Sequence, residues 1–75
     1  MTECRLREYR TLAGLTVSAL ARQAGVAERS LHRIEAGDGN PREVTLRKIY
    51  NVLITVPFYA QHPPRFEEVF PGVVA

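Results

Sequence analysis

Two arginines spaced four residues apart, Arg29 and Arg33, are the side chains of this sequence best suited to directional hydrogen bonding. A guanidinium can donate two parallel hydrogen bonds to the O6 and N7 atoms of guanine, or to the oxygens of a phosphate. Arg29 lies near the start of an expected helix and is the stronger candidate for contacting a base. Arg33, one turn later on the same face, could contact either a base or a phosphate.

The residues around these arginines could make related contacts, and each has a simpler interpretation. Ala27 could pack on a thymine methyl group, and Glu28 could accept from cytosine N4 or merely cap the helix and pair with an arginine. Ser30 could donate to a phosphate, or it could be small only to allow close helix packing. His32 lies at the edge of the same face, where it could contact a phosphate or solvent.

Residues 16–37 are expected to form two short helices joined by a tight turn, which would hold these side chains on one exposed face. Thr16 is suited to cap the first helix, because its hydroxyl can accept from a free backbone N–H. Gly25 is suited to the turn, because it adopts a positive φ without the steric cost of a Cβ. Apolar residues recur at helical spacing on the opposite face: Leu20, Ala21, Ala24, Leu31 and Ile34.

The composition describes one small domain with an uneven charge distribution. The chain has 75 residues, a net charge of +2, 45% hydrophobic and 24% charged residues. Nine of the ten lysine and arginine residues precede Val52, which favours a negatively charged partner, although a solvated helix surface has the same composition. No apolar run is long enough for a transmembrane span, and no secretory signal is recognisable, so we expect no membrane association and a cytoplasmic protein.

The sequence offers little for catalysis, and we expect no enzyme activity. Cys4 is the only cysteine, and His32 and His62 are far apart, so neither a disulfide framework nor a metal site is expected. No nucleophile with an adjacent base and no pair of carboxylates in a cleft can be assembled, and the chain is too short for a deep pocket. We expect no cofactor.

Four consecutive stretches resemble the helix-turn-helix family of phage repressor and Cro-type (XRE-like) regulators. Ala21, Gly25, Val26, Leu31 and Ile34 fall where that family places small, glycine and apolar residues. LREYRTLAGLT is similar to its first helix, IEAGDGNP to its loop after the second helix of the motif, and VTLRKIYNVL to its fourth helix. The resemblance covers residues 6–53 and implies an all-α, lambda-repressor-like fold of four or five helices, with helices near residues 3–13, 17–24, 27–36 and 43–53.

The resemblance also implies roles for particular residues. Arg10, on the inward face of the first helix, would pair with Glu35 at the end of the third, and this pair would be structural. In the family the loop after the third helix follows the sugar-phosphate backbone, which makes Asn40 and Arg42 candidate phosphate ligands. Asp38 would oppose DNA and is expected to serve the turn.

Two departures from the family pattern lie at the starts of the second and third helices. Val17 stands where the family often has a glutamine that contacts a phosphate, and Ala27 replaces a serine or threonine. Thr16 and Ser18, together with the first backbone amides of the second helix, could still meet a phosphate.

The resemblance fades after Leu53, so we divide the chain into a helix-turn-helix domain, residues 1–53, and an extension, residues 54–75. The extension is aromatic and apolar, with a short helix expected at residues 65–70. Its apolar side chains could either cap the core or form a dimer interface, and we favour the interface: Phe58, Tyr59, Phe66, Val69 and Phe70. The final residues, Val73, Val74 and Ala75, could be loose or pack on a partner.

These observations predict a sequence-specific regulator that binds double-stranded DNA. The helix at residues 27–36 would enter the major groove, and a homodimer would present two such helices about 34 Å apart to a pseudo-palindromic operator. Small phage-type repressors and the controller proteins of restriction systems are of this kind. The alternative is an antitoxin or antiactivator that uses the same fold to bind a protein, through residues 54–75.

Overall fold

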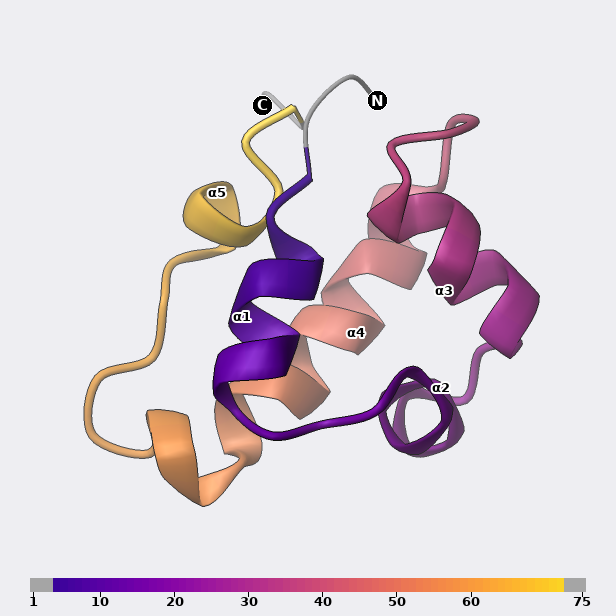
Figure 1. Ribbon diagram of the computed structural model, residues 1–75. Coiled ribbons are helices and arrows are strands. Elements are labelled where there is room, and N and C mark those ends of the chain that lie inside the picture. Colours follow the sequence, from indigo (N-terminus) through magenta and orange to yellow (C-terminus); the bar gives the residue numbers. More distant parts are fainter. Residues whose placement is uncertain (1–3, 73–75) are drawn as a thin grey trace.

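A computed structural model describes residues 4–72 as an all-helical chain with no strand in that range (Figure 1). Its elements in order are α1 (Leu6–Leu12), α2 (Val17–Ala24), α3 (Glu28–Glu35), α4 (Glu43–Thr55), a single 3₁₀ turn η1 (Pro57–Tyr59) and α5 (Phe66–Val69). The expected all-α class is therefore confirmed. The predictions that involve Glu3, Val73, Val74 and Ala75 concern residues outside this range.

Helices α2 and α3 are joined by the expected turn at Gly25. The hydroxyl of Thr16 caps α2 by accepting from the N–H of Ala19 at 3.0 Å. At the other end, Gly25 has φ 73° and ψ 32°, and the N–H of Val26 reaches back to the carbonyl of Ala21 at 3.0 Å. This left-handed closure stops α2 and redirects the chain, so that α2 is seen end-on in Figure 1 while α3 runs across the view.

Helix α4 is the centre of the fold, and Figure 1 shows it between α1 and α3. Its fully buried residues, Leu46, Ile49 and Leu53, pack into one core with the apolar residues of the other helices. Val44 is apolar too, but it is 58% exposed. At about 100° per residue, position 44 lies on the opposite side of the helix from the buried position 46, and that side faces solvent.

The start of α3 differs from the predicted start by one residue. Ala27 has φ −72° and ψ 144°, which is extended backbone, so it caps the helix from outside and α3 begins at Glu28. Its methyl group cannot accept from the free amides of the first turn, and α3 has no side-chain cap. The recognition segment predicted at residues 27–36 thus contains a helix of 8 residues.

The segment after Leu53 belongs to the same core. Helix α4 continues to Thr55, across the predicted boundary, and the chain then folds back over α1 and α4. The Tyr59 hydroxyl donates to the carbonyl of Tyr9 at 2.7 Å, and the N–H of Arg5 donates to the carbonyl of Val69 at 2.9 Å. The C-terminal segment is therefore fastened to the first helix.

Burial of these C-terminal side chains corrects the preferred dimer interface. Tyr59, Phe66, Val69 and Phe70 are all buried within the single chain, because α5 lies over the core of α1 and α4. They offer no surface to a second chain, and the core-capping alternative describes them. Phe58 differs from them, since it is 59% exposed, and its ring is nearly perpendicular to that of Tyr59, with the two centroids 4.9 Å apart.

Candidate nucleic-acid interface

The outward face of α3 carries the two arginines proposed to contact DNA, Arg29 and Arg33. Leu31, Ile34 and Glu35 are buried, and they fix which side of α3 faces the core. At about 100° per residue, Arg29 and Arg33 project directly away from that side and lie about 40° apart around the helix. Both are exposed. Two long cationic donors are thus presented side by side on a convex helical surface.

The remaining candidates on α3 flank this arginine pair. Ser30 lies on the flank nearest α4, while Glu28 and His32 lie on the other flank, and all three are exposed. Ala27 is exposed at the point where the chain enters the helix. The two arginines therefore occupy the central strip of one surface, and the other candidates on α3 lie beside that strip.

A buried ion pair holds α3 in place from behind. The carboxylate of Glu35 accepts from Nε of Arg10 at 2.6 Å and from Nη2 at 3.1 Å, so the pair implied by the family resemblance is present. The Glu35 side chain is only 1% exposed and that of Arg10 14%. Arg10 also donates from Nη1 to the carbonyl of Leu15 at 2.9 Å. One guanidinium thereby ties α1 to α3 and to the corner that leads into α2.

Arg7 also contacts Glu35, and this second contact was not predicted from the sequence. Its Nε lies 3.4 Å from Oε1 of Glu35, and the Arg7 side chain is 66% exposed. The signal was available, because Arg7 precedes Arg10 by three residues and so shares its helix face. Two arginines on one buried carboxylate leave a net positive charge at the junction of α1 and α3.

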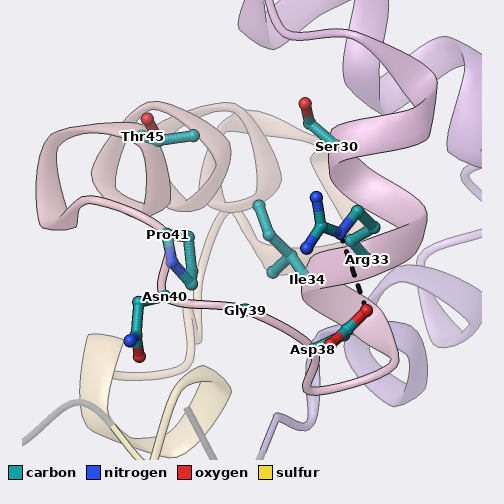
Figure 2. A pocket seen from close by; sticks show the side chains of 8 residues that line it. All are labelled: Ser30, Arg33, Ile34, Asp38, Gly39, Asn40, Pro41 and Thr45. Atoms are coloured by element: carbon teal, nitrogen blue, oxygen red, sulfur yellow. Dashed lines mark ion pairs between the residues drawn. The ribbon is translucent and has the colours of Figure 1, made fainter.

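A shallow hollow lies at the C-terminal end of α3, between that helix, the following loop and the start of α4 (Figure 2). Its volume is about 230 Å³, and polar atoms come to it from three elements: Ser30, Arg33, Asp38, Asn40 and Thr45. Figure 2 shows the Arg33 side chain along one wall, with its ion pair to Asp38 dashed. The hollow is open to solvent and adjoins the arginine face, so a polymer lying on α3 would cover it.

Three further candidates lie at the N-terminal ends of α2 and α4: Thr16, Ser18 and Arg42. Thr16 is exposed, and its oxygen accepts the capping bond, so its hydroxyl proton can still be donated outward. Ser18 is half-buried in the first turn of α2. Arg42 is exposed and directly precedes α4, and it follows Pro41, which lines the hollow.

The possible metal ligands within residues 4–72 are not grouped in space. No group of three or more histidine, cysteine, aspartate or glutamate side chains in that range is placed to hold a metal ion. Burial raises the pKa of the Cys4 thiol above its ordinary value, so the thiol stays protonated near neutral pH, unlike an activated nucleophile. No helix in the described range is both long and apolar enough to cross a bilayer.

Comparison with known families gives a match to a helix-turn-helix domain over residues 4–55, which is more than half of the 75-residue chain. The chain belongs to this helix-turn-helix domain family. Neither the curated proteins nor the solved structures give a match. In a helix-turn-helix domain the second helix of the motif is the one that lies in the DNA major groove, and the first crosses the backbone.

The matched range spans α1 to α4 and therefore includes the predicted helix-turn-helix motif, residues 16–37. In that predicted motif, α2 with its Thr16 cap is the first helix and α3 is the second. The match ends at position 55, where α4 ends, so η1 and α5 lie outside it. Arg29 and Arg33, which α3 carries, thus lie within the matched range.

Proposed function

We propose that the protein is a sequence-specific transcriptional regulator that binds double-stranded DNA with α3 in the major groove. The observation that carries the proposal is the outward projection of Arg29 and Arg33 from the second helix of the motif, while the Arg10–Glu35 pair locks the opposite face. The major groove is wide enough to admit an α-helix, and its base edges carry a distinct pattern of donors and acceptors for each base pair.

Base contacts are assigned to the central strip of α3. Arg29 lies in the first turn, where recognition helices contact base edges, and its guanidinium makes no ion pair within residues 4–72. Arg33 has the same direction one turn later. Ala27 and Glu28 would meet the neighbouring base pairs, through a thymine methyl group and cytosine N4 respectively.

Phosphate contacts are assigned to the groups that surround this strip. Thr16 and Ser18 lie at the start of α2, Ser30 and His32 on the two flanks of α3, and Arg42 before α4. Asn40 lies in the loop that borders the hollow of Figure 2. Contacts of this kind fix the position of a protein on the duplex, while the base contacts provide the sequence preference.

We also propose that the regulator is a homodimer on a pseudo-palindromic operator. Among the five aromatic and aliphatic candidates, only Phe58 is exposed, so it is the one that can contact a second chain. A two-fold dimer would place its two copies of α3 about 34 Å apart, one helical turn of DNA, on one face of the duplex.

The test is selection of duplexes from a random-sequence pool by the purified protein, followed by footprinting of the selected site over a range of salt concentrations. We expect a protected, two-fold symmetric site whose half-sites are about one helical turn apart. Weak binding that is independent of sequence and falls steeply with salt would contradict the proposal, and would direct attention to a protein partner.

A further inference from the structure

Arg33 and Asp38 form an ion pair at the edge of the outward face of α3. The Nε atom of Arg33 is 3.6 Å from Oδ2 of Asp38, and the backbone N–H of Asp38 donates to the carbonyl of Arg33 at 2.9 Å. The backbone bond fixes the carboxylate relative to the helical turn that carries the arginine. The side-chain contact is longer than a hydrogen bond and both side chains are exposed, so it adds little to folding stability. The ion pair instead affects the net charge around the guanidinium and the direction in which the guanidinium points.

The loop backbone also passes close to the same guanidinium at Gly39. A Cβ atom built on Gly39 would lie 3.2 Å from Nη2 of Arg33, so the absence of a side chain allows this close approach. Gly39 also has φ 75°, a conformation that other residues rarely adopt. Asp38 approaches from the Nε side, as the dashed line in Figure 2 shows, so within residues 4–72 its carboxylate is paired with Nε and not with Nη1 or Nη2.

We propose that Asp38 is a specificity-determining positioning residue that acts through Arg33, an inference that rests on the proposed function. With a carboxylate beside Nε, the pair carries no net charge, so its attraction to the phosphates of any duplex is reduced. The two parallel donors of Nη1 and Nη2 still match O6 and N7 of guanine, a contact that depends on geometry more than on net charge. Asp38 therefore lowers affinity for unrelated DNA and directs Arg33 toward a base.

The experiment measures binding of the full chain to a duplex selected from a random pool and to an unrelated duplex, over a range of salt concentrations. Asp38→Asn should tighten binding to the unrelated duplex about two- to five-fold, the strength of an exposed ion pair, with a smaller gain on the selected duplex. Its salt dependence should steepen by about one phosphate contact. Asp38→Glu should restore most of the discrimination.

Two controls separate this role from simpler ones. Glu67→Gln removes the same charge from an exposed position on α5 and should change neither affinity. In an Arg33→Met background, Asp38→Asn should lose most of its effect. An equal effect with and without Arg33 would mean that Asp38 acts on DNA by charge alone, and would overturn the inference.

The outcomes also distinguish this inference from the proposed function. If the wild-type protein selects a sequence and Asp38→Asn leaves its discrimination unchanged, only the role of Asp38 is overturned. If the wild-type protein selects no sequence, the proposed function fails, and the role of Asp38 fails with it. Melting temperatures within about a degree of each other would show that the variants differ in binding and not in folding.

Discussion

Glu35, near the end of the third helix, is bound on both carboxylate oxygens by Arg10 of the first helix, at 2.6 and 3.1 Å. Helix α3 has only 8 residues, and helices of that length are marginal in isolation. Its orientation must therefore come from tertiary contacts, and this ion pair and the contact of Arg7 with Glu35 are polar ones among them. The direction of Arg29 and Arg33 thus depends on two residues that face away from the proposed DNA surface.

Removing the buried carboxylate should destabilise the fold before it alters binding preference. Glu35→Ala leaves the guanidinium of Arg10 buried without a charged partner, and we expect a loss of about 3–5 kcal/mol in the free energy of unfolding. Chemical denaturation followed by circular dichroism measures it. Glu43→Ala is the matched control, because its pair with Arg47 is exposed and should contribute about 0.5 kcal/mol or less. Equal stability of the two variants would show that the buried pair contributes no more to folding than an exposed one.

Arg29→Ala should reduce discrimination between sequences. We expect a loss of about 1–3 kcal/mol on the selected duplex and a smaller loss on unrelated DNA, because a bidentate contact to one base disappears. Titration of both duplexes by fluorescence anisotropy measures the difference. Lys48→Ala, an exposed cation on α4, controls for the loss of one charge. Equal losses on both duplexes would instead assign Arg29 to a phosphate.

Arg42→Ala should weaken binding to every duplex alike. The slope of log affinity against log salt should become shallower by about one, the value for a lost phosphate contact. Sequence preference should not change, because phosphates are the same in every sequence. A variant with the wild-type slope would show that Arg42 does not contact the backbone.

Phe58 and Phe70 should respond in opposite ways to truncation. Phe70 is fully buried, so Phe70→Ala should cost about 3–5 kcal/mol of folding stability. Phe58 is largely exposed, so Phe58→Ala should leave the folding of each chain nearly unchanged and weaken the proposed dimer. Sedimentation analysis measures the dimer, and thermal melting measures the fold. A Phe58→Ala variant that dimerises as tightly as the wild type would exclude this residue from the interface.

The helix-turn-helix motif and its exposed arginines could be predicted from the sequence because their determinants are local. The capping hydroxyl of Thr16, the left-handed Gly25 and the apolar spacing of α2 and α3 all act within one or two turns. Once the buried side of α3 is known, helical geometry requires that Arg29 and Arg33 face outward. The Arg10–Glu35 pair was reached by family resemblance, because the two residues are 25 positions apart.

Whether the C-terminal segment covers its own core or a second chain depends on packing between distant parts of the chain. Apolar residues such as Phe66 and Phe70 have the same sequence pattern whether they cover their own core or a second chain. The choice follows from the uncovered surface of α1 and α4, which the segment fills, with Tyr59 bonded to a carbonyl 50 residues earlier. The ion pair of Arg33 with Asp38 is local by comparison, but it still requires the loop to fold back on the end of α3. Local patterns set which side of each helix is apolar, whereas the surfaces that meet are chosen by the whole fold.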